Sequence, residues 1–102
     1  MLASALGRVL MTTTPVFRRA PGVRWREFGS DGILLDPASG EYVQINDIGV
    51  LIWQSLEQPA TLEDVIDRVC EQCTEISAGA GDDIREFVMV LAQRQFLLAT
   101  PA

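Results

Sequence analysis

Three short β-favouring runs, separated only by tight turns, place the strongest constraint on how this chain of 102 residues can fold. The runs span residues 23–28, 32–36 and 41–45, and "GSDG" and "DPASG" stand at the two turns between them. Glycine accepts the left-handed backbone of tight turns, and Pro37 presets its own φ. Connections this short allow only antiparallel neighbours. The sequence therefore predicts a meander with residues 32–36 in the middle and residues 41–45 at an edge.

The edge run carries two different faces. Val43 and Ile45 alternate with Tyr42 and Gln44, so we expect the two β-branched residues to face the core. No lysine or proline, the residues that usually protect a strand edge, stands between Tyr42 and Ile45. No later run of comparable strength is present to pair with this one. A strand from another polypeptide is therefore a candidate to complete the sheet.

Helical patterns fill the rest of the chain. Asn46 is a favourable N-cap for a helix over residues 47–56, and Thr61 with Asp64 has the form of a capping box for a helix that continues to residue 73. A glycine-rich loop precedes a third helix over residues 82–94, and "FLLA" at 96–99 is expected to pack as a short extended end. The prediction is an α+β fold in the order β-β-β-α-α-α, with a three-stranded antiparallel sheet.

A helical-wheel projection gives the third helix two distinct faces. Ile84, Phe87, Val88 and Leu91 form its core stripe at helical spacing. At 100° per residue, Asp83, Phe87, Val90 and Arg94 fall together on one flank of that stripe. This flank is half apolar and half charged, and Phe87 borders both surfaces.

Charge divides the chain unevenly. Residues 1–26 hold five of the eight arginines and no acid, whereas the remainder holds all fourteen acids, and the net charge is −6. Residues 1–22 also lack hydrophobic periodicity, so we expect a flexible basic arm there and a folded domain over residues 23–102. An acidic body repels phosphate backbones, which argues against nucleic acid as a partner.

Targeting signals are not convincing. The chain has no apolar run of about 18 residues, and Arg8 interrupts the opening stretch where a secretory segment needs its apolar part. We therefore expect a cytoplasmic protein without a membrane partner. Met11 offers a second plausible start site.

The chain lacks the residues that usually carry out catalysis or bind metal ions. The chain has no histidine, and its two cysteines, Cys70 and Cys73, lack the further ligands of a structural zinc site. Both cysteines follow the apolar stripe of the second helix, so we expect both sulfurs to be buried. The sequence predicts no catalytic residues, no metal, no cofactor and no enzymatic activity.

Several ordered features resemble one family. These are "GILLDPASGEYVQIND", then "IGVLIWQSLEQPATLEDVIDRV", and "QRQFLL" at the end of the last helix, which together cover residues 32–98. They are similar to the PqqD-like proteins, the small winged-helix-like domains called RiPP recognition elements. The hairpin looks more like the free-standing members of lasso peptide biosynthesis than the pyrroloquinoline quinone pathway proteins.

The resemblance implies a function. Such domains bind the leader segment of a ribosomally made precursor as an added antiparallel strand along the third strand, beside the third helix, and present it to a leader peptidase or a cyclase. Carried onto this chain, the candidate peptide-binding residues are Glu41, Tyr42, Val43, Gln44, Ile45, Asp83, Phe87, Val90, Leu91 and Arg94.

Other interpretations stay open at this point. A PqqD-type chaperone would present its peptide to a radical enzyme, and the same open edge can pair with a second copy, so a monomer and an edge-paired dimer are both expected states. A winged-helix DNA-binding protein is disfavoured, because the third helix holds Asp82, Asp83 and Glu86 against Arg85 and Arg94.

Overall fold

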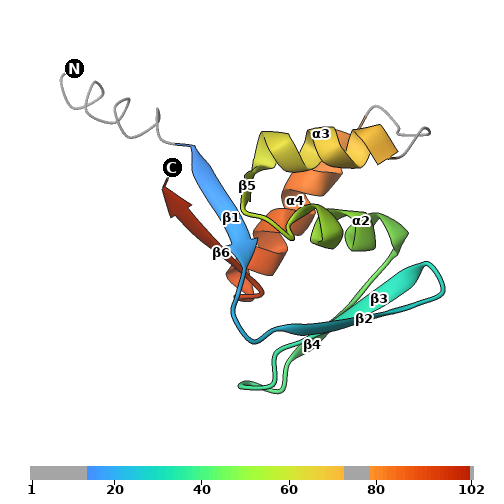
Figure 1. Ribbon diagram of the computed structural model, residues 1–102, viewed down its shortest axis with the longest axis vertical. Helices are drawn as coiled ribbons and strands as arrows, with labels where there is room; N and C mark the ends of the chain where they lie inside the picture. The colour runs from blue at the N-terminus through green and yellow to red at the C-terminus, as the bar shows by residue number, and fades with distance from the viewer. Residues whose placement is uncertain (1–13, 73–78, 102) are drawn as a thin grey trace.

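A computed structural model describes residues 14–72 and 79–101, and these form a mixed α+β fold with antiparallel sheets (Figure 1). In chain order the elements are β1 (Pro15–Arg19), β2 (Arg24–Phe28), β3 (Asp31–Leu35), β4 (Tyr42–Ile45), α2 (Asp47–Ser55), β5 (Ala60–Thr61), α3 (Leu62–Gln72), α4 (Ala80–Gln93) and β6 (Leu97–Pro101). The predicted order β-β-β-α-α-α was therefore incomplete, because it lacks β1, β5 and β6. The finer winged-helix-like assignment stays a prediction.

The predicted meander is confirmed. Strands β2, β3 and β4 form one sheet in that order, so β3 is the middle strand and β4 an edge. Leu34 of β3 lies opposite Trp25 on one side and Val43 on the other. The turns are as the glycines predict, since Gly29 and Gly40 take φ values of 65° and 78°.

The prediction of a flexible basic arm over residues 1–22 is wrong in part, because a second sheet has the order β5-β1-β6 and includes residues of that arm. Pro15–Arg19 is a strand with Phe17 at its centre only 2% exposed, so the expected arm does not extend to residue 22. Strand β1 pairs antiparallel with β6 from Pro15 opposite Pro101 to Arg19 opposite Leu97. The expected extended end at residues 96–99 is confirmed in β6, and residues 1–13 of the expected arm lie outside the described residues.

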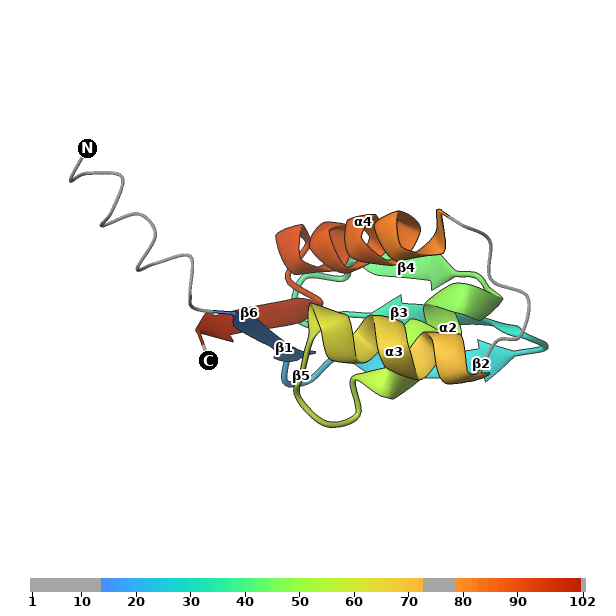
Figure 2. The same ribbon diagram turned by 90° about the horizontal axis from the view of Figure 1, so that it is seen from above.

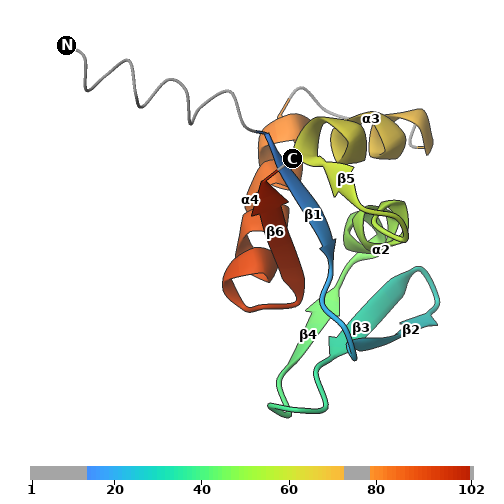
Figure 3. The same ribbon diagram turned by 60° about the vertical axis from the view of Figure 1, so that its left-hand side comes forward.

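One core joins the two sheets and the helices. The largest fully buried side chains are contributed by both sheets, all three helices and the α2–β5 and α4–β6 connections: Trp53, Phe17, Phe96, Leu34, Ile52, Leu56, Ile84, Leu91, Leu97, Val65, Val69 and Val88. Figure 3 shows the β5-β1-β6 sheet and the β2-β3-β4 sheet as separate layers, with α2 between them and α4 behind β6. Helix α2 therefore covers one face of the β2-β3-β4 sheet.

The predicted helix caps are confirmed. The Asn46 side-chain oxygen accepts from the amide of Gly49 at 2.9 Å, which starts α2 directly after β4. The Thr61 hydroxyl accepts from the amide of Asp64 at 3.1 Å, and the Asp64 carboxylate accepts from the amide of Thr61 at 3.4 Å, as a capping box requires.

Arg19 ties the second sheet to α2. Its guanidinium donates to the Trp53 carbonyl at 2.6 Å and lies 4.8 Å from the centre of the Trp53 ring and 5.6 Å from that of Trp25. Burial lowers the pKa of Arg19 from its ordinary value, while the charge of Glu57 acts in the opposite direction. The arginine is thus a structural cation between two aromatic rings.

Within residues 14–72 and 79–101, no helix is both long enough and apolar enough to cross a membrane.

Candidate peptide-binding site

The candidate site begins at the free edge of β4. Strand β4 pairs with β3 on one side, and no strand among residues 14–72 and 79–101 pairs with its other side. Ile45 is buried and Val43 is half-buried, while Tyr42 and Gln44 are exposed, as their alternation predicts. The N-terminal and C-terminal strands pair with each other in the other sheet, so neither covers this edge.

The hydrogen bonds between β4 and β3 determine which backbone amides and carbonyls of β4 point toward β3 and which point away. The amide of Asp36 donates to the carbonyl of Glu41 at 2.9 Å, which makes these two residues a hydrogen-bonded pair. Pairs in an antiparallel ladder alternate, so the amides and carbonyls of Val43 and Ile45 point toward β3. Those of Tyr42 and Gln44 then point away from β3, toward the free edge.

Helix α4 lies beside that edge. Figures 2 and 3 both show β2, β3 and β4 following one another toward α4, so the unpaired side of β4 is the side nearest α4. Arg94, the residue that caps α4, places a guanidinium nitrogen 3.8 Å from a carboxylate oxygen of Glu41. Both side chains are about half exposed, so this pair is weak, and it joins the C-terminal end of α4 to the residue that precedes β4.

A shallow hollow of about 290 Å³ lies on α4, lined by Asp83, Glu86, Phe87 and Val90. Val90 is 42% exposed and Phe87 is half-buried, so an apolar floor is open to solvent. Two carboxylates stand beside that floor. The helical projection brought together Asp83, Phe87 and Val90 correctly but missed Glu86, which the i, i+4 relation to Val90 could have found.

Gly49 positions the Phe87 ring. A Cβ at Gly49 would stand 3.0 Å from Cζ of Phe87 and 2.9 Å from Cβ of Ile45. The absence of a side chain lets the ring rest against the first turn of α2, directly after β4. The aromatic side of the hollow therefore depends on a glycine in a neighbouring helix.

Two of the expected binding residues have their side chains in the core, as their spacing in the sequence also predicted. Leu91 is 1% exposed and Ile45 is 4% exposed, so neither side chain reaches the surface between α4 and β4. Leu91 belongs to the buried stripe with Ile84 and Val88, and the hydrophobic spacing that placed it near the site also buries it.

The cysteine prediction is wrong for Cys70, which is exposed. Val65 and Val69 are the buried residues of α3, and Cys70 lies about 100° round the helix from Val69, at the margin of the stripe. Cys73 lies outside the described residues. Among residues 14–72 and 79–101, no group of three or more His, Cys, Asp or Glu side chains is arranged to hold a metal ion.

The fold has counterparts among solved structures. A solved structure described as TbiB1 in complex with the TbiA(beta) leader peptide matches with a TM-score of 0.65 and 23% identity, over 79% of this chain and 94% of that one. A second, described as lasso peptide synthetase B1 complexed with the leader peptide, matches with a TM-score of 0.63 and 30% identity, over 80% of this chain and 96% of that one. The comparison with curated proteins returns no match.

The sequence profile of the family described as coenzyme PQQ synthesis protein D (PqqD) matches residues 31–97. That range runs from the first residue of β3 to the first residue of β6, and so includes β4, α4 and the hollow on α4. The chain therefore belongs to the PqqD family.

Proposed function

We propose that this protein is a RiPP recognition element that binds the leader segment of a ribosomally made precursor peptide by strand addition to β4, beside α4. The observation that carries the proposal is the free edge of β4, where Tyr42 and Gln44 direct their backbone groups away from β3. An extended peptide placed there gains main-chain hydrogen bonds without any change in the sheet. The two solved relatives described as leader peptide complexes support the same choice of ligand.

Selectivity comes from side chains at the edge and on α4. Phe87 and Val90 offer an apolar surface to a leader side chain, while Asp83 and Glu86 favour a basic residue next to it. At the other end, Glu41 and Arg94 can each exchange their weak mutual contact for a charge on the leader.

The strength of binding follows from the small size of the contact. One added strand of four or five residues buries less area than a standard protein interface. Ordering a flexible leader also subtracts from the gross contact energy. A dissociation constant of about 1 μM, or roughly −8 kcal/mol, is the expected scale.

The bound leader is presented, in this proposal, to the leader peptidase or the cyclase of a lasso peptide pathway. The relative described as lasso peptide synthetase B1, at 30% identity, favours this pathway. The family description, PQQ synthesis protein D, keeps a chaperone role toward a radical enzyme as the second candidate. The genes beside this one distinguish the two, since a transglutaminase-like peptidase with an asparagine-synthetase-like cyclase indicates the lasso pathway.

Titration calorimetry combined with a mass measurement in solution tests the proposal. The probe is a synthetic leader from the short precursor encoded beside this gene, and the expected product is a one-to-one complex of a protein monomer. An edge-paired dimer that the leader neither binds nor dissociates would replace the proposal with an assembly role, because the same β4 edge would be occupied by a second copy.

A further inference from the structure

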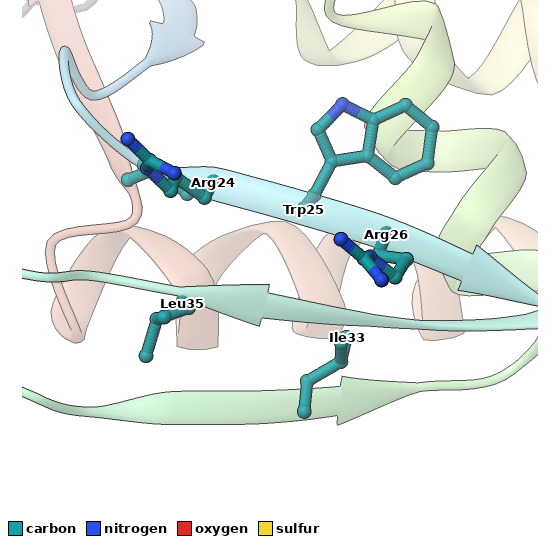
Figure 4. Close-up of a pocket in the computed structure, with 6 residues that line it drawn as sticks. Arg24, Trp25, Arg26, Ile33 and Leu35 are labelled. Atoms are coloured by element: carbon teal, nitrogen blue, oxygen red, sulfur yellow. The ribbon is translucent and has the colours of Figure 1, made fainter.

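The β2-β3-β4 sheet has a second face that no described helix covers. Its covered face holds Leu34 and Ile45, both buried, against α2. Pairing places Arg24 opposite Leu35 and Arg26 opposite Ile33 on the other face. Figure 4 shows the Trp25 ring on one side of the sheet, and Ile33 and Leu35 pointing to the opposite side.

This outer face carries apolar side chains at its centre. Ile33 is half-buried and Leu35 is 38% exposed, and both lie on the middle strand of the sheet. Tyr42, opposite Leu35 on β4, is 63% exposed, and Phe28 at the end of β2 is 47% exposed. Exposed apolar side chains gathered on one face of a sheet favour an interaction site.

A hollow of about 520 Å³ lies on this part of the sheet. Four of its lining residues, Arg24, Arg26, Ile33 and Leu35, belong to the outer face, and the other two, Val23 and Trp25, are chain neighbours of the arginines. It is larger than the hollow on α4, and none of its lining residues belongs to the proposed leader site.

The charge of the outer face has the opposite sign to that of the protein. The chain has a net charge of −6, yet Arg24 and Arg26 stand side by side on the outer face of β2. Within residues 14–72 and 79–101, neither arginine forms a salt bridge or a side-chain hydrogen bond. Two unneutralised guanidinium groups beside an apolar strand select carboxylates that are accompanied by apolar side chains.

We propose that the outer face of β2 and β3 docks a partner protein through a segment that presents carboxylates beside apolar side chains. The carboxylates pair with Arg24 and Arg26, and the apolar side chains cover Ile33 and Leu35. A second copy of this chain fits less well, because two outer faces stacked together bring four arginines into one interface. Nucleic acid fits less well also, since a chain with a net charge of −6 repels phosphate groups and this face offers only two arginines to bind them.

The docking surface adjoins the proposed leader site without sharing its hollow. Leu35 lies opposite Tyr42 and Ile33 opposite Gln44, the two residues whose backbone groups face the free edge. A partner seated on the outer face would therefore lie next to a peptide bound at β4. The inference does not depend on leader binding, because its contacts are made by β2 and β3.

Peptide selection provides the test. The probe is a displayed library of random 12-residue peptides, selected against the full chain carrying Val90→Asp, which disfavours binding in the α4 hollow. Selected peptides are synthesised both as the acids and with their carboxylates replaced by amides. Binding is measured to the wild type and to the Arg24→Glu, Arg26→Glu double variant, and methyl resonances of Ile33 and Leu35 locate the contact.

The expected result is peptides rich in acidic and apolar residues that shift those two methyl resonances. We expect their affinity to fall at least about tenfold on charge reversal and on conversion to the amide form. Arg24 and Arg26 are exposed, so the double variant should retain the wild-type unfolding midpoint. If it does not fold, the Arg24→Gln, Arg26→Gln variant replaces it, with a smaller loss in the same direction.

Three outcomes would overturn the proposal. One is a selection without acidic excess, and another is equal binding to the wild type and the double variant. The third is concentration-dependent movement of the Ile33 and Leu35 resonances without any peptide, which would assign the face to a second copy. Failure of leader binding would leave each of these readouts unchanged, so the two proposals are tested separately.

Discussion

At the scale of single residues, Val90 is the sharpest probe of the proposed leader site. It is 42% exposed, it lines the hollow on α4, and the core of the helix is made by other residues. We expect Val90→Asp to weaken leader binding at least about tenfold, or about 1.4 kcal/mol, because a third carboxylate replaces apolar surface beside Asp83 and Glu86. The unfolding midpoint should change little. Titration calorimetry with the leader measures the loss.

Met89 supplies the matched control for that variant. It is 41% exposed and directly precedes Val90, but it lines a different hollow, formed with β1 and α3. Met89→Asp should therefore leave leader affinity within about twofold of the wild type. Equal weakening by both variants would show that the added charge acts at long range, and it would remove α4 from the site.

Gly49 shows how one residue sets the shape of the hollow. A methyl group there meets Cβ of Ile45 at 2.9 Å and the Phe87 ring at 3.0 Å, and the Ile45 atom cannot move without its backbone. We expect Gly49→Ala to lower the free energy of unfolding by about 1–3 kcal/mol and to displace the Phe87 ring. Denaturant unfolding and the aromatic resonances of Phe87 report the two effects.

Gly81, in the first turn of α4, has open space around the position of a Cβ. Gly81→Ala should therefore stabilise the protein by up to about 1 kcal/mol, through helix propensity alone. If the two alanine variants shifted stability in the same direction, the close approach of Phe87 to Gly49 would not explain the effect.

At the scale of elements, the β4 edge can be tested through its backbone. The amide of Gln44 faces the free edge, so Gln44→Pro removes a donor to the leader and leaves the hydrogen bonds to β3 in place. We expect the proline variant to fold and to lose leader binding by at least about tenfold. Gln44→Ala keeps the amide and should bind within about threefold of the wild type. Leader titration of both variants decides whether the contact is made by the main chain.

Elements with local signals were predictable from the sequence. The meander is fixed by its two turns, and α2 and α3 begin at the caps that Asn46 and Thr61 predict, because these signals act over three or four residues. Strand β1 has no such signal. It begins with a proline, ends in two arginines, and meets its partner β6 about eighty residues later, so only the tertiary fold makes it a strand.

The candidate site was predicted in part for the same reason. Helical projection placed Phe87 and Val90 together, since the geometry of one helix is local. The flank defined by that projection had Val90 as its outermost residue and so omitted Glu86, which lies about 40° further round the helix. The Gly49 contact and the Glu41–Arg94 pair join segments far apart in the sequence, and a single sequence carries no pattern for contacts of that kind.

At the scale of the whole molecule, the second sheet makes the N-terminal segment part of the fold. Strand β1 lies between β5 and β6, and Phe17 is 2% exposed in the core. A chain that begins at Val23 should show no cooperative unfolding transition, because loss of Phe17 alone costs about 3–5 kcal/mol out of a typical total of about 5–15. A chain that begins at Thr14 keeps β1 and should melt cooperatively.

Calorimetric or circular dichroism melting of both truncations makes the comparison. A sharp transition for the chain that begins at Val23 would mean that residues 23–102 form the domain alone, as the sequence first indicated.

The pairing of β1 with β6 has a practical consequence for building with this protein. Pro15 lies opposite Pro101, so the polypeptide enters and leaves the fold at neighbouring points. Neighbouring entry and exit points let a module be grafted into a surface loop of a carrier protein. Such a graft would attach the domain to an unrelated scaffold at both of its ends and leave the β4 edge free to bind a peptide.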